Sequence, residues 1–481
     1  MHSEFIREQK RYKQEELCKI FSCSEDKTVS IIRKLKEFGV LKTVKAEEKQ
    51  RDMSELIDED IEISEVETGK NECLYVFTFV GIIVVFGIVL KCYPKYLLTI
   101  INPEEELKQV IKVLEKYNSK EQTIKMFNDI DENKSFNLLA VLLFLLHDYY
   151  ENGIYENTDD IIEKNGSGEI IWNKTINETF AIISNNRPYY TELKTKKRIF
   201  NNHDYFRHLH ECVLTMASSE LEKAGLLNLF ELVGVELTEE TLDDFGEKEI
   251  ILYNIEKELN NQFNTRKQLV LKTIYTYLNY QGNLHDLDCL SLFGTNSFNL
   301  VWEKICADIM DNQLNVPLGL LKLPIPLKEK YDKKQKLIEL IEKPLWTITG
   351  KYAKDTLVPD LISICEINNQ YQFIIFDAKY YNANLKNGIN PTGQPGIESI
   401  TKQYIYQLAY QNFITDHNFS IIRNCFLFPT ENDTIEDKGE VRLKMFANLG
   451  LQDIKTRFIP ASKAYELYLS GRKMDTKELN L

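Results

Sequence analysis

Two aspartates and a lysine lie in a strand-like stretch of the chain, LVPDLISICEINNQYQFIIFDAKYY, at residues 357–381. Asp360 belongs to the first apolar run of this stretch, Asp377 belongs to the second, and Lys379 follows two residues later. Carboxylates are costly to bury among apolar side chains unless something compensates their charge. These residue types at this spacing indicate a site that holds acidic and basic groups together for chemistry.

The dipeptide Asn-Asn at 368–369 joins the two runs and favours a two-residue β-hairpin loop. Counted outwards from that loop, Asp360 falls directly opposite Asp377, with Cβ atoms roughly 4.5–5.5 Å apart. Lys379 leaves the same face of the strand as Asp377, because side chains alternate along a strand. The pattern therefore predicts two acids and one lysine converging on one spot inside a sheet.

Two carboxylates at this distance repel each other, and a divalent cation bound between them removes the repulsion. Hard oxygen ligands suit Mg²⁺, with Mn²⁺ as the alternative ion, and Glu303 or a water is expected to complete the site. A metal polarises a phosphate and lowers the pKa of bound water, while a lysine stabilises developing charge. We therefore expect phosphodiester hydrolysis at Asp360, Asp377 and Lys379. The alternative is a chance PD…DxK string with solvated residues at a sheet edge.

Helical patterns flank the hairpin on both sides. SFNLVWEKICADIM begins at a capping serine and places Glu303 beside an apolar face made of Phe298, Val301, Trp302, Ile305 and Ile309. In ESITKQYIYQLAYQNF, Gln403 and Gln407 share one helical face, as do Tyr406 and Tyr410. Tyrosines at this spacing are typical of a core, whereas a glutamine there could reach the scissile backbone or Lys379.

Residues 11–45 are predicted to form a winged helix-turn-helix. SEDKTVSIIRKLKEFG begins with a capping serine, carries an apolar stripe and ends at Gly39. Lys27, Arg33 and Lys34 would face DNA from this helix. The alternative is a winged helix that docks onto protein.

The length, composition and net charge of the chain exclude several classes of protein. The 481 residues are enough for two to four domains, and 43% hydrophobic content argues against global disorder. A net charge of −14 excludes a purely electrostatic nucleic-acid binder, so DNA contacts need local patches. The strongest such patch is the lysine run that includes Lys330, Lys333 and Lys334. Nine cysteines without a CxxC pair argue against structural zinc and suit a reducing cytoplasm, and the polar N-terminus is not a signal peptide.

The uncharged run LYVFTFVGIIVVFGIVL, residues 74–90, allows two interpretations. Its 17 residues lie at the lower limit for a membrane-spanning helix, which would make the protein a membrane-anchored nuclease. Its β-branched and aromatic content favours a buried hairpin, with Gly81 and Gly87 as turn or bulge points. We predict soluble β-structure over residues 74–98 and no membrane contact.

Between the hairpin and the nuclease stretch the pattern is mainly helical. Helices are expected within 104–151, from near His203, and from 247 to about 281, and GSGEIIWNKTI is expected to be a turn that leads into a strand. His208 and His210 lie on different helical faces and are expected to be ordinary packing or surface residues.

Together these motifs resemble the LlaJI-type restriction endonucleases, which are relatives of McrC. The resemblance covers most of the chain and rests on FTFVGIIVV with YPKY, GSGEIIWNKTI, LHECVL and VPDL…DAKYY…KQYIYQLAY. It implies a PD-(D/E)xK DNA endonuclease subunit of an NTP-dependent restriction system for defence against phage and foreign DNA. The family's catalytic residues fall on Asp360, Asp377 and Lys379, its helix glutamine falls on Gln407, and its first-helix acid falls on Glu303.

The resemblance also implies a partner, a McrB-like AAA+ GTPase ring, which the parts before the nuclease would dock onto and stimulate. The sequence contains no GxxxxGK[ST] loop, so the chain itself is expected to bind no nucleotide in the P-loop manner. Double-stranded DNA is the expected substrate, with dimerisation through the assembled complex.

We therefore predict a mixed α/β, multidomain chain. Its expected parts are a winged helix at 1–45, an acidic linker at 46–73, a McrC-like β/helical partner-docking region at 74–290, and a PD-(D/E)xK restriction-endonuclease-like α/β/α domain at 291–481. The alternative function is a winged-helix DNA-binding regulatory protein with an inactive nuclease-like domain. Retention of both aspartates and the lysine argues against that alternative.

Overall fold

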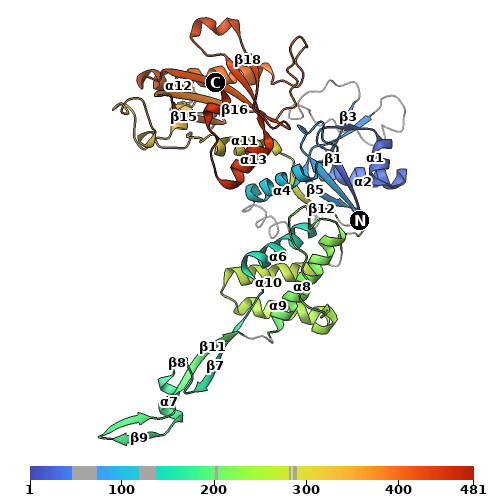
Figure 1. Cartoon of the computed structure of the whole chain (residues 1–481), viewed down its shortest axis with the longest axis vertical. Helices are drawn as coiled ribbons and strands as arrows, with labels where there is room; N and C mark the ends of the chain where they lie inside the picture. Colours follow the sequence, from blue (N-terminus) through green and yellow to red (C-terminus); the bar gives the residue numbers. More distant parts are fainter. Residues whose placement is uncertain (46–72, 119–136, 201–203, 281–282, 285, 287–289) are drawn as a thin grey trace. The chain divides into compact units, whose positions relative to one another are not determined.

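The computed structural model describes residues 1–45, 73–118, 137–200, 204–280, 283–284, 286 and 290–481 (Figure 1). The chain divides into two compact units. One contains residues 2–125 and 292–481, and the other contains Met1 and residues 126–291. The segment 46–72, which makes up nearly all of the predicted acidic linker, lies outside the described residues.

The apolar run at 74–90 forms strands, as predicted. It is covered by β4 (Cys73–Phe77), β5 (Val80–Val85) and β6 (Ile88–Tyr93). β5 and β6 pair as an antiparallel hairpin, whose turn has positive φ at Phe86 (49°) and Gly87 (74°). Every residue of β5 is buried, because the hairpin lies inside a sheet of order β1-β6-β5-β12. No helix in the described part of the chain is both long and apolar enough to cross a membrane.

The outer strands of this sheet come from distant segments. β1 (His2–Arg7) runs parallel to β6, and β12 (Leu290–Thr295) flanks β5. β5 and β12 approach each other closely at two glycines: a Cβ on Gly81 would lie 2.0 Å from the Phe293 carbonyl oxygen, and one on Gly294 would lie 2.1 Å from the Val80 carbonyl oxygen. A side chain at either position would overlap the opposite main chain, so only glycine fits. Both residues also have positive φ, which glycine adopts most readily.

The segment predicted as a winged helix contains two helices and a small sheet. Its elements are β2 (Arg11–Tyr12), α1 (Gln14–Phe21), α2 (Glu25–Glu37) and β3 (Leu41–Lys45), and β4 pairs with both β2 and β3. Leu17, Phe21, Ile32 and Leu35 are buried between them. Arg33 is exposed, while the Lys34 ammonium lies 5.2 Å from the centroid of the Phe86 ring.

A second, five-stranded sheet forms the core of residues 345–481. Its order is β15-β16-β17-β19-β18, with β15 (Leu361–Ile367), β16 (Gln370–Ala378), β17 (Ile421–Thr430), β19 (Ile454–Pro460) and β18 (Glu436–Val441). The central strands β16, β17 and β19 are parallel, and the two outer strands are antiparallel to their neighbours. A short hairpin of β13 (Leu345–Trp346) and β14 (Lys351–Tyr352) precedes it.

Helices cover both faces of this sheet (Figure 1). They are α11 (Phe298–Ile309), α12 (Ile397–Asp416) and α13 (Ala461–Ser470). α12 packs Tyr410 and Phe413 against Phe373 of β16. Phe298 of α11 packs against Tyr380, two residues after the end of β16. α13 packs beside α11, and α4 (Glu104–Asn118) packs on α13.

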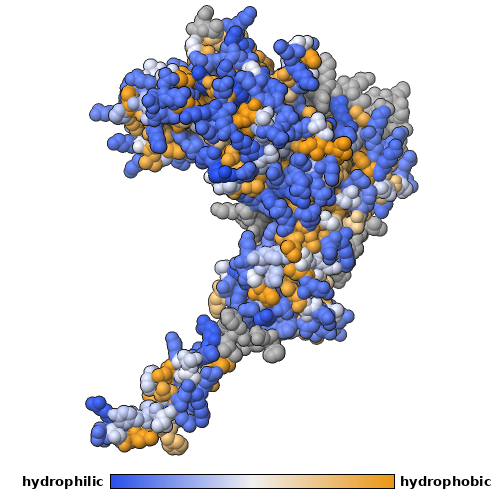
Figure 2. Space-filling model, in the orientation of Figure 1, coloured by the Kyte–Doolittle hydropathy of each residue, from blue (hydrophilic) through white to orange (hydrophobic). Residues whose placement is uncertain are grey.

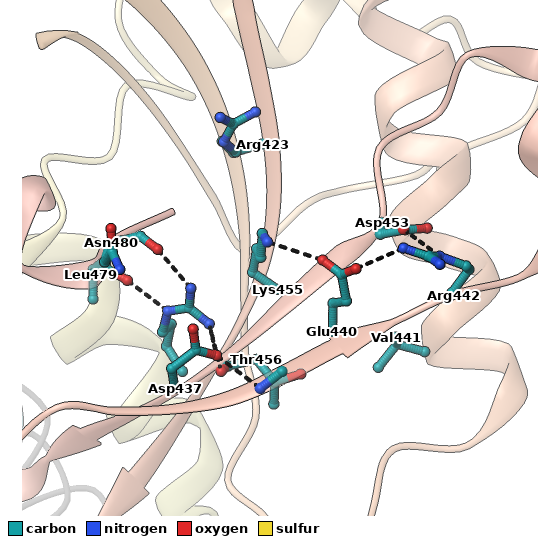
Figure 3. A network of polar contacts seen from close by, with 12 residues as sticks. Arg423, Asp437, Glu440, Val441, Arg442, Asp453, Lys455, Thr456, Leu479 and Asn480 are labelled. Atoms are coloured by element: carbon teal, nitrogen blue, oxygen red, sulfur yellow. Dashed lines mark hydrogen bonds and ion pairs between the residues drawn. The ribbon is translucent and has the colours of Figure 1, made fainter.

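The C-terminal end of the chain is tied to the sheet by one buried arginine. The Arg457 guanidinium on β19 donates to the carbonyl oxygens of Leu479 (2.6 Å) and Asn480 (2.7 Å) and pairs with Asp437 on β18 (Figure 3). The Arg457 side chain thus holds both the C-terminal turn at Leu479 and Asn480 and the edge strand β18. The neighbouring ion pairs of the network are half-exposed and contribute little on their own.

The unit of residues 126–291 has a helical part and an arm. The helices are α6 (Leu138–Asn152), α8 (Tyr205–Lys223), α9 (Lys248–Asn261) and α10 (Thr265–Asn279). The arm contains β7 (Thr158–Lys164), β8 (Glu169–Ile170), α7 (Trp172–Glu178), β9 (Ala181–Ser184), β10 (Arg187–Tyr190) and β11 (Lys194–Phe200). Figure 1 shows it extending away from the helices. His210 is buried in α8, where its Nδ1 accepts a hydrogen bond from the Tyr155 main chain (2.9 Å).

The arm corrects one prediction. GSGEIIWNKTI was expected to lead into a strand, but only Glu169–Ile170 is a strand and a helix follows from Trp172. The reason is a contact with β11 that the local sequence does not reveal. The main-chain NH of Ile171 donates to the Lys194 carbonyl, and the buried Thr175 hydroxyl accepts from the Lys194 NH (3.0 Å). These two bonds to Lys194 hold the start of α7 against β11, so the segment forms a helical turn there instead of continuing as a strand.

The approach of β5 to β12 yields a prediction. Gly81→Ala should lower the free energy of unfolding by about 1–3 kcal/mol or more, because its Cβ would overlap a main-chain carbonyl that cannot move freely. Gly388→Ala is the matched control, since Gly388 also has positive φ but no neighbouring atom within 4 Å. Thermal and urea unfolding of both variants would measure the difference, and equal losses would contradict the steric explanation.

Candidate active site at the β15–β16 hairpin

The structure has the hairpin register that the sequence predicts. β15 and β16 pair from Leu361 opposite Phe376 through to the strand ends at the loop. Asn368 and Asn369 have φ of 53° and 60°, which is the positive φ at both central residues that a type I′ turn requires. Asp360 directly precedes β15, so the same register places it opposite Asp377.

The three predicted residues Asp360, Asp377 and Lys379 are brought together. The Lys379 ammonium lies 2.9 Å from Oδ2 of Asp377, which is only 4% exposed. The Asp360 carboxylate accepts a hydrogen bond from the Ala378 main-chain NH (2.9 Å) and contacts the Asp377 carboxyl. Asp360 therefore connects the start of β15 to the end of β16, because it binds the main chain of Ala378, which lies between Asp377 and Lys379.

The two carboxyl groups make Asp377 a strained acid. Burial is the largest cause that raises the pKa of Asp377 well above its usual range, and the Asp360 charge adds to it, while Lys379 opposes the shift. Without further positive charge Asp377 therefore favours holding a proton. Two adjacent carboxylates are hard oxygen donors, which is the donor chemistry that suits a divalent cation.

Glu303, the third predicted ligand, lies on α11 within the electrostatic field of the pair. Burial and then the Asp360 charge raise the pKa of Glu303 to about 7, and Lys379 and Asn299 act in the opposite direction. Within the described residues, however, no set of three or more His, Cys, Asp or Glu side chains is placed to hold a metal ion. Direct ligation by Glu303 together with the two aspartates stays a prediction, and Mg²⁺ commonly keeps several waters in carboxylate sites.

Residues outside the motif fix the strand ends. The Asn312 amide oxygen accepts from the main-chain NH groups of Ile362 and Leu314 (both 3.1 Å), and its amide NH₂ donates to the Asp360 carbonyl (3.4 Å). On the other strand, the Lys379 main-chain NH donates to the Leu427 carbonyl (2.8 Å). Asn312 was missed by sequence reasoning, since a lone asparagine in a loop 48 residues before Asp360 carries no local pattern.

Two further side chains of α12 approach the lysine and the aspartates. The Lys379 ammonium lies 3.4 Å from the Ser399 hydroxyl. Tyr406 donates to the Val358 carbonyl (3.0 Å), and burial, followed by the charges of Asp377 and Asp360, raises the pKa of Tyr406 to about 12. Tyr406 was expected to be a core residue, and it packs in the core while also bordering the site. Ser399 was not predicted.

Gln407 has different partners from those that the sequence suggested. Its amide oxygen accepts from the Asn424 side chain (2.8 Å) and the Gln452 main-chain NH (3.0 Å). Gln403, on the same helical face, donates to the Ile375 carbonyl (2.8 Å), two residues before Asp377. Both glutamines are fully buried. Gln407 therefore connects α12 to β17 through Asn424 and to the loop before β19 through Gln452. A catalytic role for Gln407 stays a prediction.

The predicted lysine patch is partly neutralised. Lys328 and Lys330 both pair with Asp416 at the end of α12, and these two lysines with the Tyr331 hydroxyl lower the pKa of Asp416 below its usual range. Lys333 and Lys334 are exposed. The patch therefore presents Lys333 and Lys334 more freely than Lys330.

Comparison with known proteins gives one family and a few relatives. A model of the LlaJI restriction endonuclease family matches residues 79–460. The chain is 27% identical over 426 residues to the Type II restriction enzyme BsuMI component YdjA of Bacillus subtilis (strain 168), an alignment that covers 84% of this chain and 83% of that protein.

Two solved assemblies from Thermococcus gammatolerans contain similar chains. The first is a half-complex of McrB AAA+ hexamers with bound McrC, at 10% identity and a TM-score of 0.38, covering 98% of this chain and 99% of that chain. The second is the McrBC complex, at 11% identity and a TM-score of 0.23, covering 58% of this chain and 79% of that chain.

The raised pKa of Glu303 predicts a pH effect on stability. The folded protein, with a Glu303 pKa of about 7, holds this proton more tightly than an unfolded chain with a pKa near 4.5. The resulting stabilisation is complete below pH 4.5 and is lost as the pH rises through 7. In EDTA, Glu303→Gln should therefore lose less stability than the unaltered protein between pH 5 and pH 8. Melting temperatures at both pH values measure this, and parallel losses would contradict it.

Proposed function

Because the chain belongs to the LlaJI restriction endonuclease family, whose members are nuclease components of restriction systems, we propose that it cleaves double-stranded DNA at Asp360, Asp377 and Lys379. The observation that carries this proposal is the adjacent pair of carboxyl groups, with Asp377 buried and the Lys379 ammonium 2.9 Å from one Asp377 oxygen. Phosphodiester hydrolysis needs negative oxygen donors for a metal and a cation beside the phosphate, and this hairpin supplies both.

Asp360 and Asp377 would hold Mg²⁺, or Mn²⁺, and we assign Glu303 to completing the same site. When bound, such an ion supplies charge that polarises the phosphate and activates water. The Lys379 side chain, held by Asp377, is placed to stabilise the charge that develops on the phosphate or to orient the attacking water. Gln407 is proposed to act through the position of α12 relative to β17.

DNA contacts are assigned to two basic regions. Lys27, Arg33 and Lys34 lie on α2 of the proposed winged helix, and Lys330, Lys333 and Lys334 lie in the loop before the catalytic hairpin. In a chain with a net charge of −14, local lysines and arginines must supply the attraction to phosphates. A regulatory DNA-binding protein with an inactive nuclease-like domain is the rival function, and a complete set of two aspartates and one lysine disfavours it.

We also propose that the chain acts in the cytoplasm with an AAA+ GTPase ring that binds the nucleotide, and that nuclease subunits pair through this complex. The arm of residues 158–200 supports a docking role. Its far end exposes apolar side chains that a monomer would normally bury: Trp172, Ile176, Phe180, Ile182, Ile183 and Tyr189. Figure 2 shows hydrophobic residues at the surface of this arm.

The first test of this function compares cleavage with GTP hydrolysis. In the complex with the AAA+ subunit, GTP, Mg²⁺ and plasmid DNA, Asp360→Asn, Asp377→Asn and Lys379→Ala should each lower cleavage by about 10²–10³-fold or more. Stimulation of the partner's GTP turnover should not change, because the variants keep their shape. Lys402→Ala, at a surface pair with Glu398, is the control and should cleave normally. Full cleavage by Asp377→Asn would refute the site.

The second test addresses the arm. Phe180→Asp together with Ile183→Asp should weaken binding to the ring by about tenfold or more, since buried aromatic anchors commonly contribute about 2 kcal/mol to an interface. Phe180 is 98% exposed and Ile183 is 66% exposed, so folding should be retained. Phe263→Asp, at a residue 92% exposed outside the arm, is the matched control. Unaltered binding and GTP turnover in the arm variant would exclude the arm from docking.

A further inference from the structure

Tyr380, the residue after the catalytic lysine, points away from the proposed site into a buried junction. The Lys379 ammonium contacts Asp377 and Ser399, whereas the Tyr380 hydroxyl contacts Glu8, so the two neighbouring side chains have different surroundings. Tyr380 is 5% exposed, and its ring packs against Phe298 of α11 and edge-on against Tyr96 from the N-terminal part of the chain. The neighbour of the lysine is therefore enclosed by residues from segments far apart in the sequence.

The polar end of Tyr380 is held by two residues of the N-terminal sheet. Its hydroxyl donates to the Glu8 carboxylate, and the Lys95 main-chain NH donates to the same carboxylate (3.2 Å) and to the hydroxyl oxygen (3.4 Å). The Lys95 ammonium lies 4.5 Å from the centroid of the tyrosine ring. All three side chains are buried. A buried network of this kind is costly to leave half-satisfied, so it fixes its members firmly.

Glu8 and Lys95 follow the ends of two neighbouring strands. Glu8 comes directly after β1, Lys95 comes two residues after β6, and the Glu8 main-chain NH donates to the Tyr93 carbonyl (2.9 Å). Because β1 and β6 are parallel, their carboxyl ends meet at one edge of the sheet. The tyrosine hydroxyl is bound at that edge.

Lys379 is held at both ends of its side chain. The ammonium contacts Asp377 and Ser399, while the main chain is fixed by the bond from the Ala378 NH to Asp360 and by the bond from the Lys379 NH to the Leu427 carbonyl. On the C-terminal side of the lysine, the Tyr380 side chain adds a further buried anchor. A separate contact, in which the Glu431 carboxylate accepts from the main-chain NH groups of Leu98 (2.8 Å) and Thr99 (3.0 Å), also joins the N-terminal part to the nuclease part. Among the described residues this exposed contact shares no hydrogen bond with Tyr380 or Glu8, so it separates a purely adhesive role from a positioning role.

We propose that Glu8 and Lys95 are positioning residues for the nuclease, acting through Tyr380 to set the place of the Lys379 ammonium. The ends of β1 and β6 thus complete the cleavage site although they contribute no group to it. This inference rests on the proposed function of Lys379. It assigns a catalytic consequence to the first eight residues of the chain, which lie more than 350 positions before the lysine that they position.

Three variants and one control test the proposal in the complex with the AAA+ subunit, GTP, Mg²⁺ and plasmid DNA. Tyr380→Phe keeps the ring but removes the hydroxyl, and Glu8→Ala removes the acceptor. Each should lower kcat for cleavage by about 10–100-fold, with KM for DNA and GTP turnover unchanged, because a small displacement of a catalytic group has effects of this size. Glu8→Gln, which still offers an oxygen acceptor, should recover most of the activity. Glu431→Ala, which removes the separate contact to Leu98 and Thr99, should cleave normally.

A second measurement does not depend on activity. Hydrogen–deuterium exchange of the peptide that contains the Lys379 NH should be faster in Tyr380→Phe and Glu8→Ala, and unchanged in Glu431→Ala and Glu8→Gln. Normal cleavage and normal exchange in Tyr380→Phe would overturn the proposal, as would equal losses in Glu431→Ala. If the unaltered complex cleaves no DNA, the proposed function fails, while the exchange result still decides whether the junction holds the lysine.

Discussion

The structure around the site depends on keeping two carboxyl groups side by side, of which the Asp377 carboxyl is buried. Burial and the neighbouring Asp360 charge raise the pKa of Asp377 well above its usual range, so charge on Asp377 needs compensation. Lys379 offsets part of that charge, and the Ala378 NH offsets another part. Helices on both faces of the sheet keep the local dielectric low, which makes each of these interactions stronger than it would be at the surface.

Local rules explain why much of this hairpin could be predicted from the sequence. A two-residue Asn-Asn loop fixes the register, and a slip of one residue would move every side chain to the other face. The same kind of reasoning worked for the strands at 73–93, where β-branched content decides between strand and helix, and for the apolar face of α11. In each case the deciding residues are within one element or one turn of each other.

The features that were missed depend on residues distant in the sequence. Asn312 bonds to Asp360 and Ile362 across a loop, Gln407 finds its partner Asn424 on another strand, and Thr175 binds β11 instead of continuing a strand. None of these pairings follows a period of two or of 3.6 residues, so no pattern along the chain can reveal them. Tertiary contacts overrode local propensity at GSGEIIWNKTI, where the β-branched residues end up in a helical turn.

The β1-β6-β5-β12 sheet receives the chain directly after the unit of residues 126–291, because β12 is its last strand. The arm belongs to a unit of residues 126–291, and the chain leaves that unit through β12. β12 is held against β5 at the two glycines where no side chain fits, and β5 is hydrogen-bonded along its length to β6. β6 leads within two residues to Lys95, which borders the Tyr380 hydroxyl. β12, β5 and β6 are therefore hydrogen-bonded neighbours in one sheet, and the chain that leaves β6 contacts the Tyr380 hydroxyl at Lys95, next to the proposed catalytic lysine.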